Sequence, residues 1–146
     1  MDSGSSNAGA LETVRRFLLV ILVIGILGTA VELVLLEHYE TSGQLIPLTL
    51  LGLGLGALCW QAATRHGASL RAVQIVMVLF VASGLLGVLM HYQANVEFQQ
   101  EVDPSVTGMA LLQKVLHAKA PPALAPGVMV QLGLIGLVYA WRQPGR

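Results

Sequence analysis

Acidic, imidazole and phenol side chains gather where two apolar stretches of the chain end. The sequence Glu-His-Tyr-Glu occupies 37–40 and follows one apolar run, and Glu32 lies about one turn earlier, inside that run. His-Tyr recurs at 91–92, at the end of another apolar run. Carboxylates and imidazoles bind metal ions, and imidazoles titrate near neutral pH. These residues are therefore the candidates for chemistry in this chain.

A divalent-metal site is the first use that these side chains suggest. Glu32, Glu37, His38 and His91 offer the oxygen and nitrogen ligands that zinc, iron or manganese accept, and Glu40 adds a carboxylate. No Glu-x-x-His pair lies inside an apolar run, and no His-Glu-x-x-His sequence occurs. The residue types therefore fit a metal site, but the patterns of di-iron bundles and zinc proteases are absent.

Haem b is a second use, because helical bundles can hold it between two imidazoles on facing helices. His38 and His91 are the pair that we expect on one side of the membrane, near its surface. His66 belongs to the opposite side, and His117 belongs to a loop. A haem site would therefore depend on His38 and His91.

Quinone binding or proton transfer is a third use. Glu32, Tyr39, His91 and Tyr92 can donate and accept hydrogen bonds and can titrate near the membrane surface. A simpler alternative gives them no chemistry. In that case Glu32 and His91 form a hydrogen-bonded pair that fixes the register of two helices, and 37–40 is a solvated loop.

The composition predicts an all-α membrane protein. Hydrophobic residues make up 55% of the 146 residues and charged residues only 11%. A helix needs about 20 apolar residues to cross the hydrocarbon core, which is roughly 30 Å thick. Runs of about this length occur at about 17–36, 45–63, 72–92 and 126–141. We therefore expect a bundle of four transmembrane helices in a single domain, 14–142.

Basic residues predict the orientation of this bundle, because cytoplasmic loops are enriched in Lys and Arg. One side carries six arginines and the other two lysines: Arg15, Arg16, Arg65, Arg71, Arg142 and Arg146 against Lys114 and Lys119. Both termini are then cytoplasmic, in a bacterial inner membrane. We expect residues 1–13 and 143–146 to form flexible tails.

The loop between the third and fourth spans is long enough to hold structure of its own. Asp103 and Pro104 are typical of a helix start, and apolar residues then recur at helical spacing: Val106, Met109, Leu112, Val115 and Leu116. We expect an amphipathic helix at about 104–118 on the extracytoplasmic side. It would lie on the membrane surface or cap the bundle.

Glycines predict where the spans touch, because small residues let transmembrane helices approach closely. Gly25 and Gly28 share a face with Glu32, and Gly52 and Gly56 form a GxxxG pair. Gly84, Gly87, Gly133 and Gly136 mark the last two spans. A carboxylate in hydrocarbon is costly. We therefore expect Glu32 to face inward, in a polar cluster with Thr49, His91 and Gln131.

Function follows from size and from what the sequence lacks. The net charge is zero and aromatic residues are few, which argues against nucleic-acid binding. The single cysteine, Cys59, excludes an internal disulfide. No motif names a reaction. We expect a non-enzymatic subunit or accessory of a larger membrane complex, or a homo-oligomer, surrounded by lipid. The alternative is a redox, quinone, haem or divalent-metal protein with its site in the outer half of the bundle.

Overall fold

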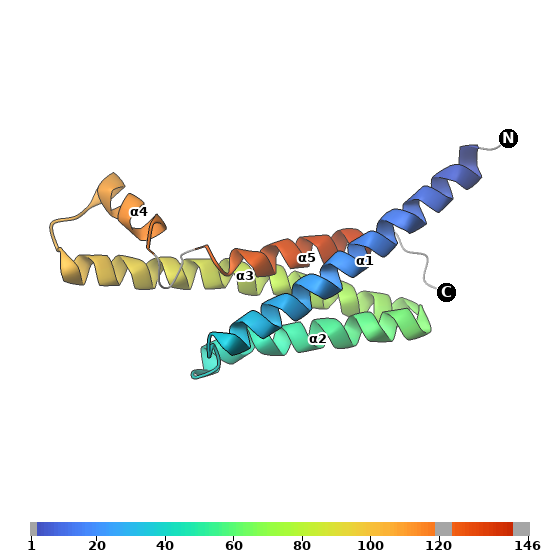
Figure 1. The fold of residues 1–146 in the computed structure, drawn as a ribbon, viewed down its shortest axis with the longest axis horizontal. Coiled ribbons are helices and arrows are strands. Elements are labelled where there is room, and N and C mark those ends of the chain that lie inside the picture. Colours follow the sequence, from blue (N-terminus) through green and yellow to red (C-terminus); the bar gives the residue numbers. More distant parts are fainter. Residues whose placement is uncertain (1–2, 119–123, 142–146) are drawn as a thin grey trace.

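Five α-helices make up the described part of the chain, and that part contains no strand (Figure 1). The computed structural model describes residues 3–118 and 124–141. In chain order the helices are α1 (Ser3–Leu35), α2 (Ser42–Thr64), α3 (Gly67–Val102), α4 (Gly108–Leu116) and α5 (Gly127–Tyr139). The predicted all-α class is confirmed.

Three of these helices, α1, α2 and α3, are long and apolar enough to cross a membrane. The apolar part of α1 that qualifies is Gly9–Leu35. Helix α5 is equally apolar but has only 13 residues, or about 20 Å at 1.5 Å per residue. Turns at 124–126 and 140–141 extend it at each end. Three of the four expected spans are therefore present as long helices, and the fourth is shorter than expected.

Helices α1 and α3 are longer than the bilayer core. They have 33 and 36 residues, which correspond to about 50 and 54 Å. Helix α1 begins at Ser3, within the segment 1–13 for which the sequence predicts a tail. Extending an existing helix costs far less than nucleating one. An Arg16–Glu12 ion pair of 2.6 Å adds one link in this exposed part.

Helix α3 also continues past the expected end at 92, as far as Val102. Residues 93–102 contain neither glycine nor proline, so nothing interrupts the helix there. Two predicted features lie outside the described residues: the C-terminal tail at 143–146 and the basic residues Lys119 and Arg142.

Short turns connect the three long helices, so that each runs antiparallel to the one before it. Thr41 precedes α2, and its N–H donates to the Gln44 side chain at 2.9 Å, as in a capping box. Helix α2 begins earlier than expected, so Pro47 lies in its second turn and not its first. Arg65 ends α2 in a left-handed conformation (φ 51°), and the His66 ring accepts from Ala68 N–H to cap α3.

The tightest contact in the bundle is between α3 and α5, which run antiparallel side by side (Figure 1). A Cβ added at Gly84 would lie 2.7 Å from Val130 Cγ2, and one at Gly133 would lie 2.7 Å from the Met77 carbonyl oxygen. Since each glycine admits the opposite helix, the predicted packing role of glycines in these two helices is confirmed. Just past the end of α5, Arg15 of α1 donates a hydrogen bond to the Trp141 carbonyl at 3.0 Å.

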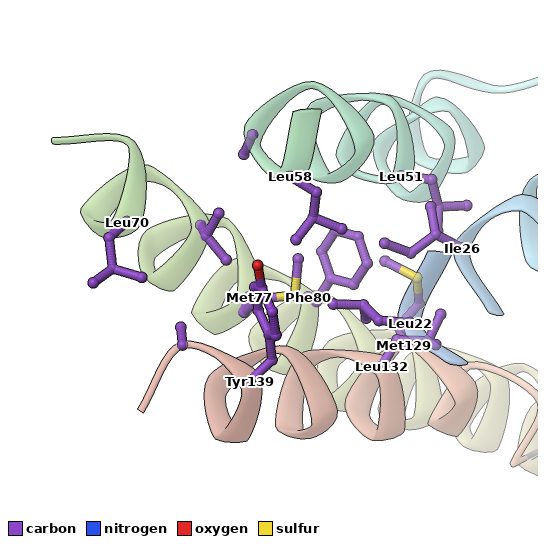
Figure 2. Close-up of a cluster of buried hydrophobic side chains, with 13 residues drawn as sticks. Leu22, Ile26, Leu51, Leu58, Leu70, Met77, Phe80, Met129, Leu132 and Tyr139 are labelled. Carbon is purple, nitrogen blue, oxygen red and sulfur yellow. The ribbon is translucent and has the colours of Figure 1, made fainter. Parts of the chain in front are cut away.

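The hydrophobic core lies between all four long or apolar helices (Figure 2). Phe80 and Met77 of α3 sit at its centre and are fully buried. Around them pack buried side chains of the other helices: Leu22, Ile26, Leu51, Leu58, Met129, Leu132 and Tyr139. This core fixes the rotation of each helix about its axis and hence which residues face outward.

Helix α4 folds back on the extension of α3 (Figure 1). It spans Gly108–Leu116 and is shorter than the expected 104–118. Asp103 does not start the helix. Its carboxylate instead accepts from the backbone N–H and the hydroxyl of Ser105, and Gly108 has a φ of 59° that sets the helix off in a new direction. Val115 is fully buried against α3.

Candidate functional site

The two expected imidazoles meet at the end of the bundle where α1 passes into α2, which we call the outer end because the sequence predicts it to be extracytoplasmic. The ring centroids of His38 and His91 lie 6.5 Å apart, with the ring planes at 67°. His38 follows α1 in the turn to α2, and His91 lies in α3, so the contact joins two elements distant in sequence. Both side chains are half-buried. The expectation that the two His-Tyr ends emerge together agrees with this geometry.

The turn after α1 explains how His38 reaches α3. Glu37 adopts the left-handed conformation (φ 54°), which bends the chain back at the end of the helix. The His38 N–H then donates to the Leu33 carbonyl at 2.8 Å, and the Glu37 N–H to the Val34 carbonyl at 3.0 Å. These bonds satisfy carbonyl groups that the helix end leaves unpaired, as in a Schellman-type cap.

Burial lowers the pKa of His38 below its usual value, and the neighbouring His91 lowers it further. Desolvation disfavours the charged imidazolium, and a second cation beside it adds repulsion. Both effects favour the neutral form of His38. A neutral imidazole has one nitrogen free of a proton, which can accept a hydrogen bond or bind a metal ion.

Glu32 does not lie where the sequence predicted. Its side chain is exposed, and Thr49 and Gln131 are exposed as well, so the expected inward cluster with His91 does not form. The face of α1 that packs inward contains Leu22, Ile26 and Thr29, and Glu32 lies about 60° around the helix from Thr29.

The two glycines that suggested an inward Glu32 behave differently from each other. Gly25 touches Leu132 of α5, whereas a Cβ at Gly28 would meet nothing within 4 Å. Gly25 thus lies at the border of the contact with α5, and Gly28 lies beyond it with Glu32. Gly25, Gly28 and Glu32 do share one face of α1, but that face lies at the edge of the contact between α1 and α5.

The remaining predicted site residues do not form a metal-binding group with the imidazole pair. Glu37, Tyr39 and Glu40 are exposed, and Tyr92 is half-buried. Within residues 3–118 and 124–141, no three His, Cys, Asp or Glu side chains come close enough together to hold a metal ion. Glu32, Glu37, His38 and His91 thus do not form one such group in the described residues, and the contact that the structure shows among them is the one between His38 and His91. The same two would be the axial ligands of a haem.

A polar network at the opposite end of the bundle escaped the sequence analysis. Ser69 is fully buried, and its hydroxyl lies 2.5 Å from Gln61 Oε1 and 2.8 Å from the His66 carbonyl. Thr64 also bonds to this hydroxyl, at 3.1 Å. The available signal was positional. Polar residues in the last turn of α2 and the first turn of α3 flank a two-residue turn, so antiparallel helices must bring them together.

The outward face of α2 differs from the outward faces of the other helices. It carries a row of small, uncharged, exposed residues over four turns: Thr49, Gly52, Gly56, Cys59 and Ala63. We call this row the small-residue face. Many other exposed positions of the bundle are large and apolar, for example Phe17 and Ile24 in α1 or Ile75 and Leu89 in α3.

The small-residue face lies opposite the side of α2 that packs in the bundle. Leu51, Gly54 and Leu58 face inward, and a Cβ at Gly54 would lie 2.8 Å from Phe80. At Gly52 and Gly56 an added Cβ would meet nothing within 4 Å. The two outward glycines therefore serve no packing purpose within the described chain.

Comparison with protein families, with curated proteins and with solved structures finds no match to this chain. Its function must therefore be argued from the geometry described above.

Proposed function

We propose that this chain is a multi-pass membrane protein that acts by association and not by catalysis, and that the small-residue face of α2 is its contact surface. The partner that we propose is a second copy of the chain. An accessory role in a larger complex would use the same face with a different partner. The observation that carries the proposal is the pair Gly52 and Gly56, open and outward in a helix of membrane-spanning length.

Membrane topology is the frame of this proposal. We infer that α5 is a fourth crossing and that both ends of the chain are cytoplasmic. In support, α5 lies antiparallel to α3 and ends beside Gln74 and Arg15, which donate to the carbonyls of the two residues after the helix, Ala140 and Trp141. Arg65 and Arg71 lie at the same end of the bundle, as the positive-inside rule requires of a cytoplasmic face.

The energetics of a lipid-facing helix favour a contact at the small-residue face. Lipid tails are as apolar as leucine, so helices associate in a bilayer through close packing, and glycines four residues apart let two backbones approach. A glycine inside a helix costs about 1 kcal/mol relative to alanine. Gly52 and Gly56 incur that cost without any packing gain within the described chain. A second helix against this face would supply the gain.

A second copy fits this face because the face is complementary to itself. Residues 49–63 contain no charged side chain, so two copies meet without like-charge repulsion. In a twofold contact each residue near the axis meets its own counterpart. The hydroxyl of Thr49 lies at one end of the row, where it can hydrogen-bond across the contact. Leu53 and Trp60 border the row and would pack around the crossing point.

The test is the oligomeric state of two matched variants. Gly56→Leu fills the small-residue face, whereas Gly28→Leu places the same side chain at another open, exposed helical glycine. Neither added side chain meets a neighbour at its Cβ, so both variants should keep the wild-type fold. We expect wild type and Gly28→Leu to be dimeric in lipid nanodiscs by native mass spectrometry, and Gly56→Leu to be monomeric.

Two results would contradict the proposal. One is a wild-type chain that stays monomeric in the bilayer and co-purifies with no protein that Gly56→Leu loses. The other is a Gly56→Leu variant that dimerises as fully as wild type. A different membrane protein that wild type retains and Gly56→Leu loses would assign the same face to a larger complex in place of the second copy.

A further inference from the structure

The imidazole pair at the outer end has a separate use that does not depend on association through α2. We propose that His38 and His91 form an exchangeable two-imidazole site for a borderline transition-metal cation, with Zn²⁺ as the representative ion. The site joins the turn after α1 to α3. It would bind from the extracytoplasmic side, because both residues lie at the end of the bundle opposite the arginines.

The separation of the rings is close to what such a bridge requires. A Zn–N bond of about 2.0–2.1 Å and the size of an imidazole put each ring centroid roughly 3.2 Å from the metal ion. Two such rings lie roughly 5–6.4 Å apart, depending on the N–Zn–N angle. The observed 6.5 Å lies just beyond that range. A tetrahedral bridge therefore needs the rings to approach by roughly 1–1.5 Å and one nitrogen of each ring to turn toward the shared ion.

The position of His38 makes that small approach feasible. His38 lies in a turn and not within a helix, and its side chain is only half-buried. Helix α1 packs against α2 and α5, whereas α3 packs against α2, α4 and α5. Since α1 and α3 each pack mainly against other helices, the contact between His38 and His91 is one of the few links between their outer ends. A bound ion would tighten that link.

Imidazole side chains suit such an ion. A metal ion binds the neutral ring and competes with protons for it. Each imidazole has two nitrogens. One can bind the ion while the other keeps a hydrogen bond, an arrangement common among metal-binding histidines.

The surroundings indicate a site that releases its ion readily. Glu32, Glu37 and Glu40 belong to the same end of α1 and its turn, and their exposed carboxylates attract cations to it. No third His, Cys, Asp or Glu side chain completes a metal-binding group within the described residues. Water would fill the other coordination positions, as it does in open zinc sites. Such a site exchanges metal with its surroundings and does not hold it permanently.

The experiment uses the full-length chain in detergent, with any affinity tag removed and metal stripped by a chelator. Zn²⁺ alone is titrated into wild type and four single variants by calorimetry at pH 7. His38→Gln and His91→Gln remove the proposed ligands, and His66→Gln and His117→Gln remove the other two histidines as controls. We expect one Zn²⁺ per wild-type chain and at least tenfold weaker binding in each ligand variant, with both controls unchanged.

Circular dichroism of each variant shows whether it is folded before it is titrated. As a second measurement, Zn²⁺ should raise the thermal unfolding temperature of wild type and of both controls, but not of His38→Gln or His91→Gln. Two outcomes would overturn the site: no saturable Zn²⁺ binding to wild type, or equal weakening in a control and a ligand variant. Neither result bears on dimerisation through α2, which the Gly56→Leu comparison tests separately.

Discussion

The close approach of α3 and α5 predicts that a single methyl group at Gly84 destabilises the bundle. A Cβ there would lie 2.7 Å from Val130 Cγ2, 2.8 Å from Val130 N and 2.9 Å from the Pro126 carbonyl oxygen. Two of these three atoms are backbone atoms, one of Val130 in α5 and one of Pro126 directly before it. A side-chain rotation therefore cannot relieve the contact, and the two helices must move apart.

The size of the effect follows from these distances. Non-bonded heavy atoms pack at about 3.5–4.0 Å, so α5 would have to shift by roughly 0.7–1 Å. Gaps of 0.5–1 Å already forfeit about a quarter to a half of the dispersion attraction between facing atoms. Overpacking of this kind costs about 1–3 kcal/mol. Replacing glycine by alanine gains at most about 1 kcal/mol in helix propensity.

A matched pair of variants separates the cost of overpacking from the gain in helix propensity. Gly28→Ala gives the same gain in propensity at a position where an added Cβ meets nothing within 4 Å. We expect Gly84→Ala to be less stable than Gly28→Ala by about 1–3 kcal/mol. Reversible unfolding in mixed detergent micelles, followed by circular dichroism or tryptophan fluorescence, measures this difference. Equal stability of the two variants would refute the inferred α3–α5 packing.

Two further predictions concern the two ends of the bundle. Ser69→Ala removes the hydroxyl that lies 2.5 Å from Gln61 Oε1, and should lower the free energy of unfolding by about 1–3 kcal/mol in the same micelle assay, because a buried amide loses a partner. At the outer end, the bonds from Ser105, and to a lesser extent the charge of Lys114, hold the pKa of Asp103 below its usual value. A carboxyl whose pKa is lowered by folding stabilises the fold above its unfolded pKa, near 3.9, and loses that contribution as the pH falls through the folded pKa. Hydrogen exchange of the α4 amides, corrected for the intrinsic pH effect, should therefore speed up below about pH 4 in wild type and change less in Asp103→Asn.

The sequence predicted where the helices lie along the chain better than which side of each helix faces the bundle. Apolar length alone located the three long spans, because a bilayer demands about 20 apolar residues whatever the fold. Gly84 and Gly133 were also expected at helix contacts, and each lies in the part of its helix that the partner helix covers. The same reasoning misplaced Glu32. Glu32 lies close to one edge of the face that α1 packs into the bundle. Whether such a residue is buried or exposed depends on where α5 lies, which the sequence does not show.

Helix ends were the other source of error, and their causes are local. Helix α3 runs on to Val102 because nothing in 93–102 breaks it, which hydropathy does not report. Helix α4 begins at Gly108 and not at Pro104, because Asp103 bonds to Ser105 and forms a turn instead of a cap. The Ser69 network is visible in the sequence only when the polar residues on both sides of the turn between α2 and α3 are considered together, because hydropathy treats each helix separately.

Oxidative cross-linking of Cys59 in native membranes tests most directly whether α2 is a contact surface. Cys59 is the single cysteine of the chain, is exposed, and follows Gly56 by three residues on the small-residue face. A contact centred on Gly52 and Gly56 brings two copies of Cys59 close enough to form a disulfide. The control moves the thiol to α1 in a Cys59→Ala, Val31→Cys double variant, at a position that is also exposed. We predict rapid formation of a disulfide-linked dimer by wild type and little by the control. Cross-linking of wild type no faster than of the control would contradict association through α2.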